Sequence, residues 1–254
     1  MSERSSPRAA LLLIGNELLS GRTRDANLAH LATRLGTRGI RLVEARVVAD
    51  VPDAIVAALD ALRGEYELVF TTGGIGPTHD DITVDCVARA FGVAVVENAE
   101  ARARLEAFWA QRGITGNAER LRMARIPEGA ELIDNEVSAA PGFRIGNVYV
   151  MAGVPSIMSA MLEHILPTLP SGPLVHSVGV AVFGVGEGEI AGPLRKLQAR
   201  YPTVDLGSYP GRRDGRSRVE LVARATDEAA LAEVHAALRA LVESLGAESD
   251  GADG

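Results

Sequence analysis

The segment Leu68–Thr83, with the sequence LVFTTGGIGPTHDDIT, carries the residues of this chain that are best suited to chemistry. A strand-like apolar run leads into the glycine-rich turn Gly73-Gly74-Ile75-Gly76-Pro77, and a helix-like run follows over 84–91. A turn of this kind between a strand and a helix can present bare backbone N–H groups to an anion, with the helix dipole behind them. The segment therefore indicates binding of a phosphorylated ligand.

Two adjacent carboxylates, Asp80 and Asp81, follow the turn directly. Hard oxygen ligands beside a phosphate site are typical of Mg²⁺, so the pair predicts a divalent cation. The competing interpretation is a tight loop whose aspartates only cap a helix. Side chains of adjacent residues seldom point into one site, so we expect one of the two to face solvent. His79 either contacts phosphate or is solvated, and Thr83 is expected to be the N-cap of the helix.

The spacing of the glycine turn fits neither of two well-known phosphate motifs. A P-loop requires Lys-Ser/Thr after its last glycine, whereas Pro77-Thr78 stands there. A dinucleotide fingerprint requires a third glycine, and Gly74-Ile75-Gly76 is followed by Pro77-Thr78-His79 instead.

The composition is that of an α/β protein of reducing compartments. The 254 residues are 47% hydrophobic with a net charge of −7, which argues against a broad nucleic-acid footprint but leaves room for a local basic patch. The single cysteine, Cys86, cannot form an internal disulfide and is expected in the core. Neither a signal peptide nor a run of ~18 apolar residues is evident. We expect a cytoplasmic protein with neither a nucleic-acid nor a membrane partner.

Strand-like and helix-like segments alternate along the first two thirds of the chain, which predicts a doubly wound, mostly parallel sheet. The expected strands are 9–14, 42–48, 68–72 and 147–151, and the expected helices are 27–35, 51–62, 84–91, 99–112, 118–124 and 155–166.

Three prolines and a glycine at 167–173 interrupt regular structure and predict a domain boundary. We expect a first domain over 1–170, a smaller α+β subdomain over 171–246 and a disordered tail over 247–254. Within the subdomain the basic segment Arg212–Arg218 is interpreted as a solvated hairpin tip rather than a binding site.

Ligands of doubly wound sheets bind outside the carboxyl ends of the strands. The loops leaving those ends carry five polar residues, namely Asn16, Glu17, Asp50, Asp80 and Asp81. If these loops converge, the mouth is acidic and would repel a phosphate unless a cation intervenes.

The stretch Gly73-Gly74-Ile75-Gly76-Pro77-Thr78-His79-Asp80-Asp81-Ile82-Thr83 resembles the signature of the MoaB/Mog molybdopterin-binding superfamily. The Thr-His-Asp-Asp form is most similar to the N-terminal region of the competence/damage-inducible CinA proteins and to the related domain of some FAD synthases. Three further segments agree, namely 15–21, 140–143 and 153–155. The resemblance runs from about Ala9 to Leu166, and more loosely the segment after Pro173 resembles the middle region of CinA proteins.

This resemblance implies a MoaB/Mog-like fold, a small phosphorylated ligand (pterin or nucleotide), Mg²⁺ or another divalent cation, and a homo-oligomer. Two functions follow from it. One is hydrolysis of a nucleoside-diphosphate linkage of the ADP-ribose or FAD type; the other is non-hydrolytic binding or adenylation of molybdopterin in molybdenum cofactor synthesis. The amidohydrolase domain of CinA proteins has no counterpart in the resemblance, so deamidation is not expected.

Site residues follow partly from the resemblance. Catalytic roles fall to Asp81 and Asp50, with Glu17 as a metal ligand or base unless it is only salt-bridged at the surface, and the metal falls to Asp81 with Asp80. The ligand-binding residues are Gly15, Asn16, Gly73, Gly74, Gly76, Pro77, Thr78, His79, Ser138, Pro141, Gly142, Gly153 and Pro155. Asn16 and the pair Ser138-Ala139 depart from the residues usual in the family, which leaves the substrate open.

Overall fold

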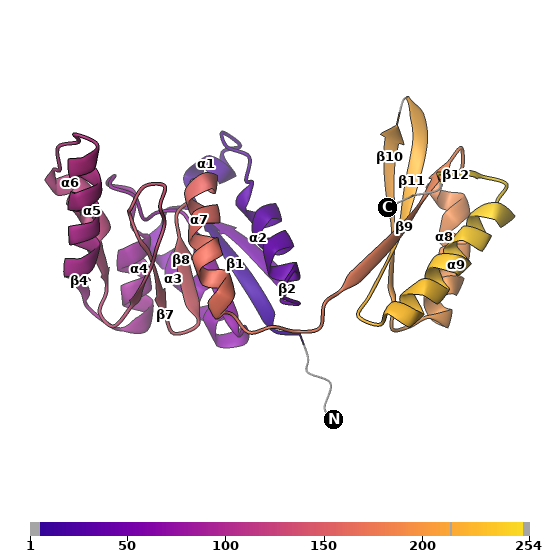
Figure 1. Ribbon diagram of the computed structural model, residues 1–254, viewed down its shortest axis with the longest axis horizontal. Helices are drawn as coiled ribbons and strands as arrows, with labels where there is room; N and C mark the ends of the chain where they lie inside the picture. The colour runs from indigo at the N-terminus through magenta and orange to yellow at the C-terminus, as the bar shows by residue number, and fades with distance from the viewer. Residues whose placement is uncertain (1–5, 214, 251–254) are drawn as a thin grey trace. The chain divides into compact units, whose positions relative to one another are not determined.

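The computed structural model describes residues 6–213 and 215–250 and forms two compact units, Met1–Gly172 and Pro173–Gly254 (Figure 1). Each unit has its own sheet and its own hydrophobic core. None of the helices in the described ranges is long and apolar enough to cross a membrane.

The larger unit is built on a six-stranded sheet in the order β2-β1-β3-β8-β7-β6. The first four strands are parallel, β7 pairs antiparallel with β8, and β6 pairs antiparallel with β7. The strands are β1 (Arg8–Ile14), β2 (Arg41–Val48), β3 (Leu68–Thr72), β6 (Glu131–Ile133), β7 (Gly142–Ile145) and β8 (Val148–Met151). The predicted mostly parallel, doubly wound sheet is confirmed.

The alternation of side chains along β1 places helices on both faces of this sheet. Leu11 and Leu13 pack with residues of α2 (Asn27–Gly36) and α7 (Pro155–Ile165), whereas Leu12 and Ile14 pack with residues of α3 (Pro52–Glu65) and α4 (Thr83–Phe91). Since successive strand residues point to opposite faces, a continuous apolar run is what a strand covered on both faces requires.

Several short elements of the larger unit escaped the sequence analysis. The strands β4 (Val95–Glu97) and β5 (Arg125–Pro127) form an antiparallel pair, and β6 and β7 extend the main sheet. Segments of three or four residues are too short to show a period of two. The first turn of helix after β1, α1 (Asn16–Leu19), lies where a loop was expected, and α5 (Ala99–Gln111), α6 (Ala118–Leu121) and the 3₁₀ turn η1 (Arg122–Ala124) lie near their predicted ranges.

Cys86 lies in the core of the larger unit, as predicted. It is buried on the inner side of α4, and burial raises the pKa of its thiol to about 11. A thiol so far from ionisation at neutral pH is a poor nucleophile, which agrees with a packing role.

The smaller unit has the order strand, helix, strand, strand, helix, strand. Its elements are β9 (His176–Phe183), α8 (Glu187–Arg200), β10 (Asp205–Arg213), β11 (Arg216–Ala225), α9 (Glu228–Ser244) and β12 (Glu248–Asp250). The four strands form an antiparallel sheet in the order β10-β11-β9-β12. This is the split β-α-β arrangement of ferredoxin-like domains, and the α+β expectation holds.

The core of the smaller unit lies on one face of its sheet. Val180 and Val182 of β9 and Leu221 of β11 pack against the apolar side of α9, which includes Leu238. Both helices lie on this face in Figure 1. Consequently the alternate residues of β9, β10 and β11 face away from the helices.

The tail differs from its prediction as a disordered segment. Residues 248–250 form β12, which pairs antiparallel with β9 at the edge of the small sheet. Residues 251–254 lie outside the described residues. The composition of the tail could not predict this strand, because an edge strand of three residues is stabilised by backbone hydrogen bonds to its neighbour rather than by apolar side chains.

A fragment ending at Gly172 should fold by itself, whereas one ending before Leu169 should not. Leu169 is buried in the core of the larger unit after the 3₁₀ turn η2 (Leu166–Thr168), its carbonyl accepts a hydrogen bond from Arg38, and the Gly172 N–H donates to the Arg38 carbonyl at 2.9 Å. We expect residues 1–172 to unfold in a single cooperative urea transition. An insoluble or non-cooperative 1–172 fragment, set against a cooperative full chain, would contradict this.

Candidate functional site

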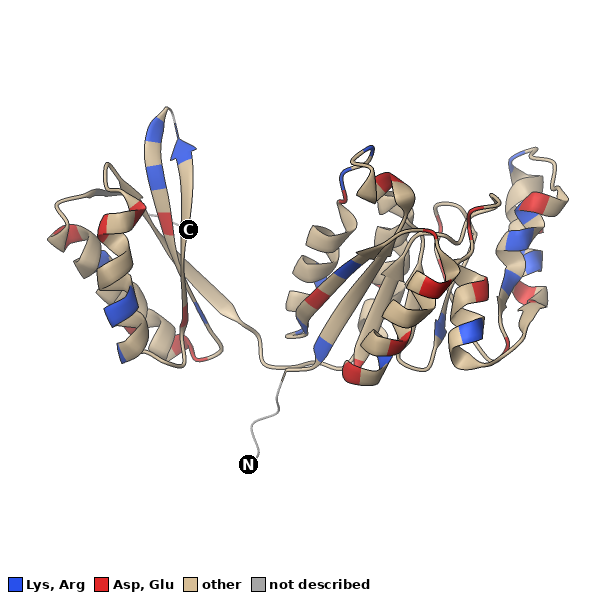
Figure 2. Ribbon diagram, turned by 180° about the vertical axis from the view of Figure 1, so that it is seen from behind, with Lys and Arg blue, Asp and Glu red and all other residues tan. Residues whose placement is uncertain are grey.

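A cavity of about 540 Å³ opens at the carboxyl ends of the parallel strands. The chain passes from β1 to its neighbour β2 through α2 on one face, and then across β1 to β3 through α3 on the other face. The loops after β1 and β3 therefore diverge to opposite faces, and such a switch point leaves a crevice between them. Figure 2 shows acidic residues on the loops at this end of the sheet.

Glycine is required where the loop after β3 meets the end of β1. Gly73 has φ +105°, and a Cβ at this position would lie 2.1 Å from the Ile14 carbonyl oxygen. Gly74 has φ +68°, and its Cβ would lie 2.2 Å from Thr83 Oγ1. Neither conformation nor space admits a side chain, so these glycines allow the backbone to turn closely beneath the cavity.

Thr83 fastens this turn to the first residue of α4. Its hydroxyl donates to the Gly73 carbonyl at 2.9 Å, and its N–H donates to the Gly74 carbonyl, also at 2.9 Å. The prediction of Thr83 as N-cap is wrong, because the N-cap is Ile82 and no side chain caps the helix. The hydroxyl is fully buried and stabilises the glycine turn instead.

Three consecutive backbone amides of the turn are available to a ligand. Gly73 N–H donates to the Met151 carbonyl at 3.1 Å, but within the described residues the N–H groups of Gly74, Ile75 and Gly76 donate to no protein acceptor. All three residues line the cavity. A row of unpaired amides beside a helix start is the donor set that anions bind in proteins.

The adjacent carboxylates of Asp80 and Asp81 converge on one hydroxyl. Thr78 Oγ1 lies 2.5 Å from Asp80 Oδ1 and 2.6 Å from Asp81 Oδ2, and the Thr78 N–H also donates to Asp81 Oδ2 at 2.7 Å. The hydrogen bond from Thr78 and a second from its own backbone amide lower the pKa of Asp80, so its carboxylate stays ionised at neutral pH. Both side chains line the cavity, and Asp80 is exposed to solvent, as expected for one of the pair, whereas Asp81 is half-buried.

Across the cavity, Asp50 and Asn16 join the loops after β2 and β1. The Asn16 N–H donates to Asp50 Oδ2 at 2.8 Å, and the Asp50 N–H donates to Asn16 Oδ1 at 3.4 Å. Asp50 thereby caps α1 at its first residue. Glu17 folds back over Gly15, where an added Cβ would lie 2.4 Å from its Oε1. No other described side chain pairs with the Glu17 carboxylate, which leaves it free toward the cavity.

Most of the predicted site residues line this one cavity. They are Gly15, Glu17, Asp50, Gly73, Gly74, Gly76, Pro77, Thr78, Asp80, Asp81, Ser138, Gly153 and Pro155. Four others do not line it. Asn16 holds Asp50, His79 is exposed on the turn, and Gly142 lies in β7, where a Cβ would meet the Val150 carbonyl at 2.4 Å. Pro141 borders a separate hollow of about 260 Å³.

The family model described as "Probable molybdopterin binding domain" matches residues 10–171, and "FAD synthase, middle domain" matches residues 180–249. A protein of Aeropyrum pernix is 38% identical over 256 residues, with 94% of this chain and 95% of that protein covered. This chain belongs to the molybdopterin-binding domain family. A CinA-like protein of Geobacter sp. is 42% identical over 195 residues, which cover 72% of this chain. The chain spans about half the length of such CinA-like relatives, 46% in the Geobacter protein.

A solved structure of the CinA protein of unknown function from Thermoplasma acidophilum agrees with the fold. The TM-score is 0.59 at 32% identity, over 65% of this chain and 98% of that protein. The matched share corresponds in size to the larger unit, whose MoaB/Mog-like α/β fold and CinA-like membership were both expected from the glycine turn and its acids.

In this molybdopterin-binding domain the sequence analysis missed the apolar half of the cavity. Ile75, Met123, Ile157 and Met161 line it together with several alanine and valine residues. Ile75 lies in the glycine turn, Met123 in η1, and Ile157 and Met161 in α7. No common sequence pattern links these separate elements, so their shared position became visible only in three dimensions.

Asn135 is a second omission. It is 7% exposed, its Oδ1 accepts from the N–H groups of Val137 and Ser138 at 3.0 and 2.8 Å, and its Nδ2 donates to the Ala140 carbonyl. These bonds hold Ser138 and Ala140 at the wall of the cavity and keep Ala139 at φ +57°. An asparagine that bonds to residues two and three positions ahead is a recognised turn device, and this signal could have identified it.

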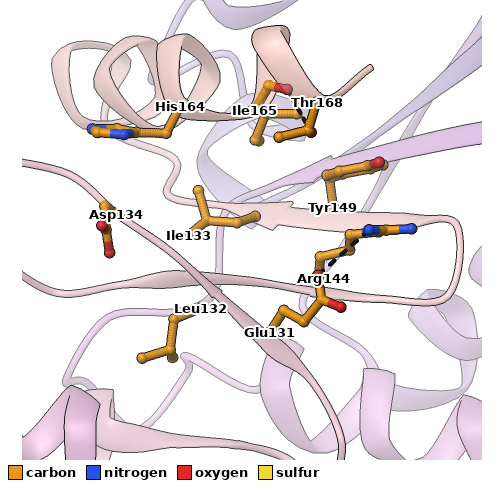
Figure 3. A pocket seen from close by; sticks show the side chains of 9 residues that line it. All are labelled: Glu131, Leu132, Ile133, Asp134, Arg144, Tyr149, His164, Ile165 and Thr168. Carbon is orange, nitrogen blue, oxygen red and sulfur yellow. Dashed lines mark hydrogen bonds and ion pairs between the residues drawn. The ribbon is translucent and has the colours of Figure 1, made fainter. Parts of the chain in front are cut away.

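A further hollow of the domain, of about 250 Å³, contains none of the predicted residues. In Figure 3 side chains of α7 and η2, including His164 and Thr168, face Ile133 of β6 and Tyr149 of β8. Its basic residue Arg144 pairs with Glu131 at 3.4 Å. This pairing leaves the hollow without the unpaired donors and converging acids of the larger cavity.

Replacing Thr83 by Val should destabilise the glycine turn while preserving side-chain volume. The buried Gly73 carbonyl would lose its hydroxyl donor, so we expect the free energy of unfolding to fall by about 1–3 kcal/mol. Urea denaturation of Thr83→Val beside Thr83→Ser, which keeps the hydroxyl, measures this. Equal stability of the valine and wild-type proteins would show that the hydroxyl does not hold the turn.

Proposed function

We propose that the chain binds a phosphorylated pterin or nucleotide together with Mg²⁺ in the 540 Å³ cavity, and hydrolyses a nucleoside-diphosphate linkage of the ADP-ribose or FAD type. One observation carries this proposal. Four carboxylates (Glu17, Asp50, Asp80 and Asp81) and three unpaired amides share one cavity, and none of the described residues lining it is basic.

The charge of this cavity favours a metal complex of the ligand over a free phosphate. An anion entering among four carboxylates is repelled unless a cation lies between them. Basic side chains adjacent in sequence to lining residues are Arg22 and Arg24 beside Thr23, Arg122 beside Met123, and His79 between Thr78 and Asp80, and none of them lines the cavity. A cation brought with the ligand therefore supplies the missing positive charge.

The donor set fits Mg²⁺ held jointly by protein and ligand. Within the described residues no group of three or more His, Cys, Asp or Glu side chains converges as a closed metal site. Mg²⁺ is commonly bound by one or two carboxylates together with substrate phosphates and water rather than by an all-protein cage. Asp80 and Asp81 would hold the cation. Both carboxylates lie beside the Thr78 hydroxyl, which has one proton to donate between them. A cation would relieve the remaining repulsion between the two carboxylates.

The protein groups divide into binding and water-orienting parts. The free amides of Gly74, Ile75 and Gly76 bind a phosphate, and Asp50 keeps the loop after β1 in place through Asn16. Glu17, which lacks a partner, orients the attacking water and accepts its proton. A divalent cation at such a site stabilises negative charge developing on the phosphates.

The apolar half of the cavity suits a planar ring. Ile75, Met123, Ile157 and Met161 contribute flexible and branched apolar surface to its lining. Binding sites for cofactor-sized ligands combine such walls with a few polar groups. A molecule with a ring at one end and phosphate at the other matches both halves, which is true of pterin phosphates and of dinucleotides.

Non-hydrolytic binding of molybdopterin is the second candidate. The description of the matched family favours it, because it specifies binding and no reaction. Both candidates use the same amides and acids, so product analysis decides between them: incubation with ADP-ribose or FAD yields nucleoside monophosphate only if the chain is a hydrolase.

Ligand binding should depend on a divalent cation. With ADP-ribose at about 100 times its Kd and Mg²⁺ present, binding should stabilise the fold by roughly 2.7 kcal/mol, and EDTA should remove most of this gain. Thermal unfolding with each ligand, with and without Mg²⁺, measures it. Equal stabilisation in EDTA would show that Arg22, Arg24 or the backbone amides bind the phosphates without a cation.

Replacing Asp81 by Asn separates metal binding from loop structure. The amide keeps the shape of the side chain and can still accept from Thr78, but it removes one negative charge. We expect the fold to survive and turnover of the dinucleotide to fall by about 10²–10³-fold, the size of losing one major electrostatic contact.

Asp80→Asn is the matched control and should reduce turnover less, because Asp80 lacks the second bond from Thr78. Glu17→Gln should lower the rate at saturating substrate while leaving Mg²⁺-dependent binding intact. Full activity in both aspartate variants would remove the carboxylates from the mechanism. A binding-only protein would show the cation dependence without any product.

A further inference from the structure

The sheet of the smaller unit has one face that its own helices leave uncovered. Leu206 of β10, Leu221 of β11 and Val180 of β9 point into the core with α8 and α9. Their neighbours along each strand point the other way. By the register of the sheet, Tyr209, Glu220 and Ala181 lie side by side across β10, β11 and β9 on this outer face.

Two aromatic rings lie on the outer face. Tyr209 is 47% exposed, and its ring covers Gly207, where an added Cβ would lie 3.0 Å from the ring. Phe183 of β9 is partly exposed and lies opposite Arg218 of β11. The α-carbons of the two residues are separated by β11 and two positions along the strands, which is roughly 10 Å across and 7 Å along the sheet.

Arginines surround both rings. The guanidinium of Arg224 lies 5.6 Å from the Tyr209 ring centroid, and that of Arg216 lies 5.3 Å from the Phe183 ring centroid. Between them Arg218 forms an ion pair with Glu220 at 3.2 Å, yet its buried Nε has no hydrogen-bond acceptor within the described residues. Figure 2 shows basic residues along the β10–β11 hairpin.

Arginines outnumber acids on the outer face of β10 and β11. By their alternation Arg213, Arg216, Arg218 and Arg224 point to this side of the two strands, against Asp205 and Glu220. The whole chain carries −7. The basic segment interpreted from sequence as a solvated hairpin tip therefore belongs to a larger basic and aromatic surface.

We propose that this outer face binds single-stranded nucleic acid. Exposed rings on an antiparallel sheet can each stack a base, and stacking tolerates any sequence because every base has an aromatic face. The arginines around the rings would contact the phosphates that run between stacked bases. Gly179 and Gly207 keep the surface flat beside the rings, since they add no side chains.

A duplex fits this surface less well than a single strand. Paired bases are already stacked on one another and cannot lie on Tyr209 and Phe183 without being unpaired.

Binding of a fluorescein-labelled oligonucleotide of about 12 nucleotides to the full chain, followed by fluorescence anisotropy, tests the proposal. Oligo(U) RNA and oligo(dT) DNA are the two single-stranded arms, and a duplex of the same length is the third. We expect both single strands to bind at low salt, with the duplex at least about 10-fold weaker. The affinity should fall with salt as expected for about three phosphates, a slope near 2.

Variants assign the binding to the outer face. Tyr209→Ala should weaken binding about 10-fold and Tyr209→Phe should not, because stacking requires the ring and not the hydroxyl. Arg224→Gln should reduce the salt slope by about 1. Arg239→Gln is the matched control, since it removes the same charge from the exposed side of α9 and should leave the affinity unchanged. Asp81→Asn should also bind normally, which separates this site from the cavity.

Three results would overturn the proposal. The first is an absence of binding to any single strand at low salt. The second is binding that Tyr209→Ala leaves unchanged, or that is equal for duplex and single strand. The third is self-association of the full chain in sedimentation, lost in Tyr209→Ala, because a second copy would then occupy this face.

Discussion

The close approach of Gly73 to the end of β1 is the constraint on which the cavity depends. A Cβ at this position would lie 2.1 Å from the Ile14 carbonyl, so only glycine lets the loop after β3 cross there. Thr83 holds the same glycine from the other side through its carbonyl. With the turn fixed at both ends, the next three amides and the two aspartates have a defined place beside the loops after β1 and β2, and the loop after β8 packs on Gly73 through Gly153.

The sheet supplies the frame for this constraint, and the frame was readable from the sequence. A run such as Ala9–Ile14 without polar interruption predicts a strand covered on both faces, and the alternation of such runs with amphipathic helices predicts parallel order. The gathering of glycines and acids at one cavity was likewise predictable, because the carboxyl edge of a parallel sheet gathers the loops that follow its strands.

What could not be predicted depends on contacts between distant segments. The apolar wall around Met123 and Met161 forms from loops and helices that have no common pattern. The role of Thr83 was misread because a threonine at a helix start usually caps, whereas here a buried carbonyl ten residues earlier accepts its hydroxyl. In the smaller unit the sequence predicted an α+β arrangement, and pairing with β11 revealed the full length of β10 across Pro210.

The position of β10 at the rim of its sheet has a consequence for the behaviour of the chain in concentrated solution. A nine-residue edge strand with free backbone groups is a template on which other chains can add and aggregate. Pro210 removes one N–H from this edge, Gly207 and Gly211 weaken its preference for extended structure, and Arg212 with Arg213 add repulsion between copies. The features that make β10 a poor strand by propensity thus protect the protein from fibrillar association.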